Sequence, residues 1–408
     1  MVDAPLQPHE VFTPGLPPLK SSNVYAHRLD VEKRLKQAMQ RHLVPIVYGD
    51  YGAGKTSVVR RFLLPEEKAG HLVYLPSASE ITMADVFRAC LEHLDYRVEV
   101  HRETSTTDRA HVGINLKFFS AGGELQDGDS TTTELAVKSP TDARLIRILS
   151  DAGIYLVIDE LHNASNEFTQ DLATFIKASR TDADGLQLIL IGTGSDARQL
   201  VRLDPGIDRY LKDTLVPLFS EAESKAIIQD GFDKLDIQVP TEVREALWLA
   251  SVGAPTIVQE LCLNVAEAAT DSEPRVATKA HLDAAIADYL ESHESRMSAK
   301  YISAIETFGS RRTRKQILHA VANTPSDYAT MEDIRSRVSA ALGIDVPSTA
   351  LSGPLGRLKS ADFGHILKDV DRVVGGTRVY NLSTFTDPMM KSFVRFAANL
   401  EKTGHSIS

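Results

Sequence analysis

The segment from Gly49 to Thr56, Gly-Asp-Tyr-Gly-Ala-Gly-Lys-Thr, constrains this chain most. It fits the pattern G-x-x-x-x-G-K-[S/T] and directly follows the apolar run 43–48, which is typical of a short buried strand. Glycines let the backbone curl until its N–H groups point at phosphate oxygens, and the helix-compatible segment 57–64 adds a helix N-terminus. The sequence therefore predicts a phosphate-binding loop between a strand and a helix.

The loop contains the residue types that a nucleoside triphosphate requires. Lys55 brings a positive charge near the β- and γ-phosphates, and Thr56 offers a hydroxyl to Mg²⁺. A glycine turn with a solvated lysine is the alternative, but a chance match in a chain this long is expected on the order of once in a hundred. We therefore predict ATP and Mg²⁺ as cofactors. The predicted nucleotide-binding residues are Gly49, Asp50, Tyr51, Gly52, Ala53, Gly54, Lys55, Thr56 and Ser57.

Composition agrees with a cytoplasmic protein of two to four domains. The chain has 408 residues, of which 43% are hydrophobic, so it can bury a sizeable core. Cys90 and Cys262 are its only cysteines, too few for a zinc site or a disulfide framework, which favours a reducing compartment. Because no apolar run approaches the roughly 20 residues that span a bilayer, we expect no membrane insertion.

Apolar runs and amphipathic segments alternate along the first half of the chain, which predicts a parallel α/β sheet. The expected strands are 43–48, 71–75, 154–160, 186–194 and 211–219, and the expected helices are 23–40, 57–64, 83–91 and 141–150.

The run 154–160 ends in two carboxylates, Asp159 and Glu160. After a phosphate-binding loop, this pattern predicts that Asp159 holds Mg²⁺ through water and that Glu160 polarises the water that attacks the γ-phosphate. A strand that merely ends in solvated acids is the alternative. The strand 186–194 ends in small polar residues, so Thr193 is expected beside the γ-phosphate, with Ser195 or a plain turn residue as the alternatives.

Other segments stand outside this alternation. Residues 1–22 are rich in proline and predict an extended arm. Residues 97–138 predict a β-hairpin insertion, either a family-specific contact or a solvated decoration. Ser220 and Glu223 have the spacing of a capping box at the start of a helix.

The order of these motifs resembles the AAA+ ATPases, and among them the origin-recognition and cell-division-control initiator-like group. The stretch 158–163, with its Asp-Glu-x-His, is also similar to the ATPases that regulate transposon target choice. The resemblance covers roughly residues 23–290. It implies an arginine that reaches the γ-phosphate bound by a neighbouring subunit, and hence a homo-oligomer. Arg209 matches that position, with Arg202 as runner-up and a surface salt bridge as the alternative.

The resemblance also implies a helical lid over residues 220–292. Two positions depart from the family pattern, one in this lid and one near the N-terminus. Thr256 stands where many relatives carry a nucleotide-sensing arginine, and Val24 to Arg28 stand where relatives often have Gly-Arg. We expect ATP binding despite both departures, with hydrolysis that is slow or stimulated by a partner.

The C-terminal part, residues 296–408, predicts a winged-helix domain after the ATPase core of residues 23–219 and the lid. It has 16 Lys and Arg against 10 Asp and Glu, although the whole chain carries a net charge of −10. The predicted helices are 313–322, 330–342 and 348–360, and the predicted strands are 366–370 and 378–382. DNA contact is expected from Arg357 and Lys359 on the third helix and from Arg372 and Arg378 on the wing.

These features predict an ATPase that works as a conformational or assembly switch on DNA or on a DNA-acting partner, as in initiation, transposition or phage defence. The alternative is a nucleotide-gated scaffold that binds an effector protein without contacting DNA. A small-molecule kinase is a third possibility, which the Asp159-Glu160 pair and the long lid argue against.

Overall fold

The computed structural model describes residues 5–50, 52–102, 114–120, 135–137, 143–182, 186–192, 204–251, 253–292, 295–305, 311–324, 328–374, 377–386 and 388–402. It divides into two compact units, each described here by itself. The sheet unit comprises Arg28–Gly49 and Val58–Val216. The helical unit comprises Met1–His27, Asp50–Ser57 and Pro217–Ser408.

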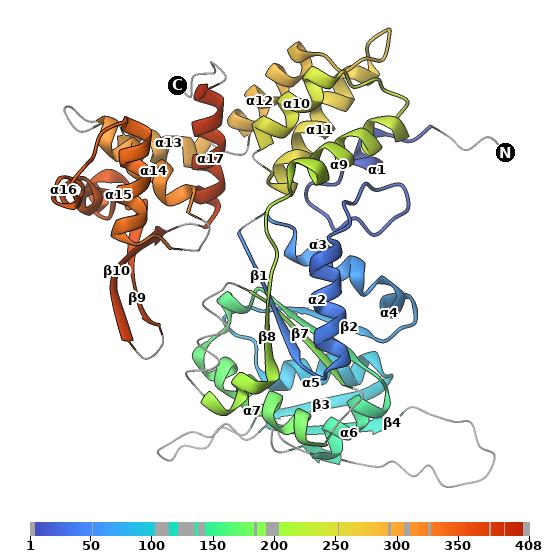
Figure 1. Cartoon of the computed structure of the whole chain (residues 1–408). Coiled ribbons are helices and arrows are strands. Elements are labelled where there is room, and N and C mark those ends of the chain that lie inside the picture. Colours follow the sequence, from blue (N-terminus) through green and yellow to red (C-terminus); the bar gives the residue numbers. More distant parts are fainter. Residues whose placement is uncertain are drawn as a thin grey trace, which may run out of the picture. The chain divides into compact units, whose positions relative to one another are not determined.

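The sheet unit is built on five parallel strands in the order β2-β6-β7-β1-β8 (Figure 1). This is the predicted parallel α/β sheet. Most of its strand residues are buried, as expected for a sheet that is covered on both faces. The strands are β1 (Val44–Tyr48), β2 (Leu72–Pro76), β6 (Tyr155–Asp159), β7 (Gln187–Gly192) and β8 (Leu211–Leu215).

Helices pack on this sheet and enclose its core. Helix α2 contacts β1 and β8, whereas α5 contacts β2 and α7 (Figure 1). In the core, the rings of Phe87 and Phe175 meet edge to face at 5.3 Å between centroids. The helices are α2 (Leu29–Gln40), α3 (Lys55–Phe62), α4 (Leu64–Lys68), α5 (Met83–His93), α6 (Ala143–Asp151), η1 (Leu161–Asn163), α7 (Asn166–Asp182) and η2 (Pro205–Tyr210).

Two predicted elements are shorter than expected, for reasons of tertiary structure. The helix predicted over 23–40 begins only at Leu29, because Val24 is buried and donates its N–H to the carbonyl of Val11 in the N-terminal arm. The strand predicted over 211–219 ends at Leu215, and two residues later Pro217 has no N–H with which to continue a ladder.

The segment between α5 and α6 contains three strands that form a separate antiparallel sheet in the order β3-β4-β5. The strands are β3 (Tyr96–Arg102), β4 (Ile114–Ser120) and β5 (Leu135–Val137). Strands β4 and β5 pair antiparallel, as in a hairpin, and β3 pairs antiparallel with the other edge of β4.

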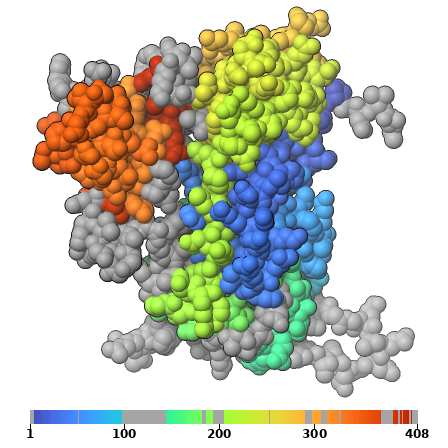
Figure 2. All heavy atoms as spheres, viewed as in Figure 1, coloured from blue at the N-terminus to red at the C-terminus, as the bar shows by residue number. Residues whose placement is uncertain are grey.

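In the helical unit, α9 to α12 share one hydrophobic core with the N-terminal arm. Figure 2 shows residues 221–290 gathered in one continuous mass. The arm is not extended throughout, because Pro8–Val11 forms a short helix, α1, with Glu10 accepting the backbone N–H of Gln7. The predicted capping box of Ser220 and Glu223 is present. The helices are α9 (Glu221–Lys234), α10 (Thr241–Ser251), α11 (Pro255–Thr270) and α12 (Lys279–Ser292).

The C-terminal part of the helical unit has its own hydrophobic cluster. The three predicted helices are followed by the antiparallel pair β9 and β10, which is the predicted order of elements. Helices α13 and α17 lie outside the sequence prediction. The elements are α13 (Ser295–Ile305), α14 (Arg311–Ala322), α15 (Met331–Leu342), α16 (Ser348–Leu358), η3 (Ala361–Phe363), β9 (Leu367–Val374), β10 (Thr377–Phe385) and α17 (Pro388–Lys402).

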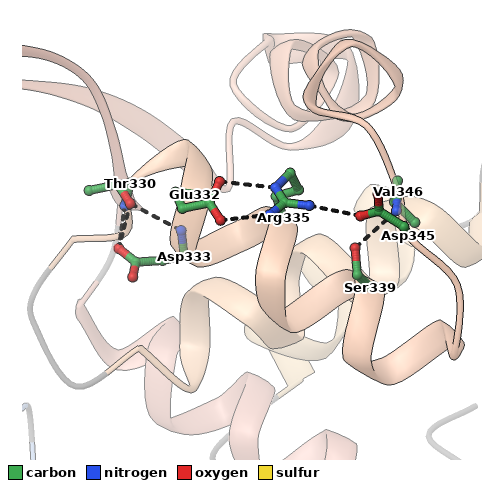
Figure 3. A network of polar contacts seen from close by, with 7 residues as sticks. All are labelled: Thr330, Glu332, Asp333, Arg335, Ser339, Asp345 and Val346. Carbon is green, nitrogen blue, oxygen red and sulfur yellow. Dashed lines mark hydrogen bonds and ion pairs between the residues drawn. The ribbon is translucent and has the colours of Figure 1, made fainter.

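Polar contacts fix both ends of α15 (Figure 3). Thr330 accepts the backbone N–H of Asp333 at 3.0 Å and so caps the helix start. Near the other end, Ser339 accepts the backbone N–H of Val346 at 3.0 Å, which holds the connection to α16. Within the described ranges, no helix is both long and apolar enough to cross a membrane.

Candidate nucleotide-binding site

Three strands of the sheet unit end at the same edge, because they run parallel and are neighbours in the order β6-β7-β1. They end at Asp159, Gly192 and Tyr48 respectively. Gly49 follows β1 directly, and a Cβ there would lie 2.2 Å from the carbonyl oxygen of Val216. Only glycine therefore fits at the first position of the predicted loop.

The loop after Gly49 folds around the backbone carbonyl of Asp50. This carbonyl accepts the N–H of Ala53 and the Nζ of Lys55, each at 3.1 Å. Gly52 and Gly54 have φ of 74° and 81°, in the left-handed region that favours glycine. The loop thus takes the tight curl that the motif predicts. Tyr51, the remaining loop residue, lies outside the described residues.

The predicted nucleotide ligands Lys55, Thr56 and Ser57 form the first turn of α3. Backbone N–H groups at this position point out of the helix end, which suits an anion. The start of α11 lies against the same loop, because a Cβ on Gly52 would come within 2.6 Å of Oγ1 of Thr256. The residue that stands in place of the sensing arginine is therefore next to the loop.

The side chain of Asp50 makes an ionic contact that the sequence analysis did not foresee. Lys391 Nζ lies 2.8 Å from Asp50 Oδ1, and Arg395 Nη1 lies 2.6 Å from Oδ2. Burial alone would raise the pKa of Asp50, but the charges and hydrogen bonds of the two cations outweigh it, and the pKa is lowered. In the sequence, the only sign of this contact is that Lys391 and Arg395 lie four residues apart. Most residues around Arg395, in the segment 393–398, are apolar.

Asp159 is 5% exposed at the end of β6. One of its carboxylate oxygens accepts the hydroxyl of Tyr74, and the other accepts the backbone N–H of Glu160 at 2.6 Å. The carboxylate is therefore held in one orientation. Among the described residues, no group of three or more His, Cys, Asp or Glu is arranged to hold a metal. A single oriented carboxylate fits Mg²⁺, which usually takes one or two carboxylates and completes its shell with phosphates and water.

Glu160 is exposed and has φ of 54° and ψ of 38°, the left-handed conformation. A non-glycine residue pays roughly 1–2 kcal/mol for this conformation. Asn163 donates a hydrogen bond from Nδ2 to Oε2 of Glu160 at 3.4 Å. The backbone thus turns sharply at the end of β6, beside the buried Asp159.

Comparison with known proteins agrees with this geometry. Residues 37–201, from α2 to beyond β7, match a family model described as an AAA domain. This range contains the loop, Asp159 and Glu160. The chain carries an AAA domain. The order of motifs in the sequence predicts an AAA+ ATPase, and the match over residues 37–201 agrees with this prediction.

Distant structural likenesses extend over nearly the whole chain. The Walker-type ATPase PABY2304 of Pyrococcus abyssi is 18% identical with a TM-score of 0.47, over 93% of this chain and 98% of the other. Cdc6p of Pyrobaculum aerophilum is 13% identical with a TM-score of 0.48, over 97% and 98%. The RuvB branch migration motor of Thermotoga maritima is 14% identical with a TM-score of 0.43, over 93% and 96%. These likenesses are too distant to carry an argument about function. No curated protein sequence matches the chain.

Just beyond the matched range of the AAA domain, Arg209 lies in η2 and is exposed. Its Nη2 donates to the hydroxyl of Tyr210 at 2.6 Å, and its guanidinium lies 4.6 Å from the centre of that ring. Among the described residues, no carboxylate forms an ion pair with Arg209. Thr193, Ser195 and Arg202 lie outside the described residues.

The cations predicted to contact DNA differ in their surroundings. Lys359 Nζ lies 2.5 Å from Asp369 Oδ1, and only 16% of its side chain is exposed, so its charge is already paired. Arg357 is exposed on α16. Arg372 and Arg378 lie on the paired strands β9 and β10, where Arg372 is opposite Val379 and Arg378 opposite Val373.

Proposed function

We propose that this chain binds and hydrolyses ATP and that its AAA domain works as a nucleotide-driven switch. The observation that carries the proposal is the end of β6, where a buried, oriented Asp159 is followed by an exposed Glu160 in a conformation that favours glycine. A carboxylate kept at a strained position is expected where the carboxylate itself is needed. The strand order supports the proposal, because β1 leads into the phosphate-binding loop from the same edge.

Each predicted residue has a role in this proposal. The N–H groups of the loop and the Lys55 ammonium bind the phosphates, and Glu160 accepts the proton of the attacking water. Mg²⁺, held by Thr56 and Asp159, would neutralise phosphate charge. Asp159 is oriented for this role by Tyr74 and the N–H of Glu160.

Assembly is the second part of the proposal. Arg209 is exposed, and its guanidinium is held by its contact with Tyr210. We propose that it reaches the γ-phosphate bound by a second copy of the chain and stabilises charge in the transition state. Full activity would then require a homo-oligomer. Thr193, beside the γ-phosphate, is proposed on the sequence pattern alone.

We propose that the switch acts on DNA or on a DNA-acting partner through the C-terminal part, residues 296–408, taken as a winged helix. The proposed divisions before it are the arm 1–22, the core 23–219 with the insertion 97–138, and the lid 220–292. The order α14, α15, α16, β9 and β10 supports this reading. Arg357, Arg372 and Arg378 are the proposed phosphate contacts, and Lys359 is the weakest candidate because Asp369 already pairs with it.

A specific observation favours the alternative, a scaffold that binds an effector protein. Within α16, the exposed residues are Thr349, Ala350, Ser352, Gly353, Gly356 and Arg357. A face made of small residues with a single cation presents few side chains that read base edges, but it allows close packing of another protein.

Catalysis is tested with three variants of the purified chain. Lys55→Ala is expected to abolish ATP binding, and Glu160→Gln to keep binding and block turnover. Glu160→Gly is the control for backbone strain, since glycine accepts the left-handed conformation but supplies no base. We expect Glu160→Gly to be stable and inactive. Normal hydrolysis by either Glu160 variant would show that another group is the base.

The partner is tested by measuring hydrolysis with double-stranded DNA at two salt concentrations. Stimulation that fades at high salt is expected if cations on the chain displace counterions from DNA phosphates. Arg357→Ala and Arg378→Ala should then reduce the stimulation. A rate of ATP hydrolysis that DNA does not change at either salt concentration would favour the protein scaffold.

A further inference from the structure

Asp50 joins two parts of the helical unit that are far apart in the sequence. Its backbone carbonyl accepts Lys55 Nζ and thereby shapes the phosphate-binding loop. One oxygen of its carboxylate accepts a hydrogen bond from Lys391 Nζ, and the other oxygen accepts one from Arg395 Nη1. The exposed fractions of the three side chains are 16%, 9% and 10% respectively, so the cluster is largely withdrawn from water.

Helix α17 is itself firmly placed in the C-terminal part. Phe393 and Val394 are buried in the same cluster as residues of α14, α15 and α16. Arg395 also donates through Nε to the carbonyl of Ala322, the last residue of α14, at 2.6 Å. A continuous chain of contacts therefore runs from α14 through Arg395 and Asp50 to Lys55.

The charge of Asp50 explains why these contacts matter for a phosphate site. A carboxylate in a loop that wraps phosphates repels them, and the repulsion is strong where water is excluded. Lys391 and Arg395 each carry a positive charge and Asp50 carries one negative charge, so the cluster has a net positive charge. With both cations in place, the net charge of the cluster attracts phosphate, whereas without them Asp50 would add an unpaired negative charge to the loop.

We propose that α17 sets the nucleotide affinity of the loop, with Lys391 and Arg395 as positioning residues that neutralise Asp50 and hold it. The inference rests on the proposed function, because it assumes that the loop binds ATP. Since coupling between two sites is reciprocal, ATP binding also stabilises the docking of α17 on the loop. A partner that pulls the C-terminal part away from Asp50 would release the nucleotide.

The test is a cycle of ATP dissociation constants, measured by titration with a fluorescent ATP analogue. The four proteins are the wild type, Lys391→Met with Arg395→Met, Asp50→Asn, and all three changes together. Methionine keeps much of the apolar stem that packs beside α14. We expect the two cation changes to raise the dissociation constant by about tenfold or more in the wild type and by less than about threefold when Asp50→Asn is present.

The matched control is Glu401→Gln, which breaks the ion pair between α17 and Lys315 of α14 without touching the loop. It is expected to leave the dissociation constant unchanged. As a second readout, saturating ATP should slow amide hydrogen exchange in residues 388–402 of the wild type, and much less so in the variant with both cation changes.

The outcomes separate this inference from the proposed function. If neither the wild type nor Lys55→Ala binds the analogue, the proposed function fails. If the wild type binds and Lys55→Ala does not, equal affinity after the cation changes would overturn the inference. A large loss that persists with Asp50→Asn would also overturn it, since the cations would then bind the phosphates directly.

Discussion

Replacing Gly231 by alanine tests whether the N-terminal arm is an integral part of the core of α9 to α12. Gly231 lies inside α9, and a Cβ there would lie 2.2 Å from Cζ and 2.4 Å from Cε1 of Phe12. In an open helix, alanine in place of glycine stabilises by about 1 kcal/mol. Overpacking a buried ring costs about 1–3 kcal/mol. We therefore expect Gly231→Ala to destabilise this core by about 1 kcal/mol.

The sign of that effect depends on Phe12. This side chain is 1% exposed, and its ring centroid lies 5.6 Å from that of Phe232. Phe12→Ala is expected to cost about 3–5 kcal/mol and to remove the atoms that oppose a Cβ at position 231. In that background Gly231→Ala should instead stabilise the core by up to about 1 kcal/mol. The coupling free energy between positions 12 and 231 is then about 2 kcal/mol. Phe12→Leu allows the same comparison at a lower cost in stability.

Cys262 provides the assay, because it is fully buried in the same cluster as Phe12. In a Cys90→Ala background, the rate at which a thiol reagent labels the folded protein reports the free energy of opening this core. A change of about 1.4 kcal/mol alters that rate tenfold. If Gly231→Ala shifts the rate in the same direction with and without Phe12, the packing of the arm against α9 is not as described.

Three further changes test other parts of the molecule. Thr330→Ala removes the cap of α15 and should cost about 0.5–2 kcal/mol, seen as an earlier thermal transition, and an unchanged transition would refute the cap. Arg314 is fully buried, and its Nε donates to a backbone carbonyl at 2.7 Å, so Arg314→Met should destabilise by about 1–3 kcal/mol and Arg314→Lys by less. No loss in either variant would show that the apolar stem alone matters. Asp50 has a lowered pKa, so its ion pairs stabilise the fold above the ordinary carboxyl pKa of about 4 and this contribution is lost as the pH falls through the lowered value. Asp50→Asn should therefore make acid unfolding less steep, and an identical acid profile would contradict the pairing.

The sheet could be predicted because its strands are continuous apolar runs that end in informative residues. The run before Gly49 and the run that ends at Asp159 are both parallel strands in the structure. A strand that is covered on both faces is a continuous apolar run, so it can be identified in the sequence without knowing which strands pair with it. The predicted boundaries were less accurate. Val24 satisfies a hydrogen bond in the N-terminal arm instead of starting α2, and such a partner is invisible in the local sequence.

The environment of the loop could not be predicted, because it depends on long-range pairing. Asp50 and Arg395 are separated by 345 residues, and neither the motif nor the composition indicates that they meet. The same holds for Thr256, which was identified as a departure from the family pattern but whose position against Gly52 follows only from the fold. The motif specifies the curl of a phosphate-binding loop, whereas the surroundings are specified elsewhere in the chain.

The short segment Asp50–Ser57 groups with residues 217–408 although both of its flanks belong to the sheet unit. This arrangement limits how such a chain can recombine during evolution or in the laboratory. Exchanging the C-terminal half for that of another protein would also exchange Thr256, Lys391 and Arg395, the neighbours of the loop. Functional chimaeras should therefore need Asp50 to be transferred together with the C-terminal half, although the two segments lie far apart in the gene.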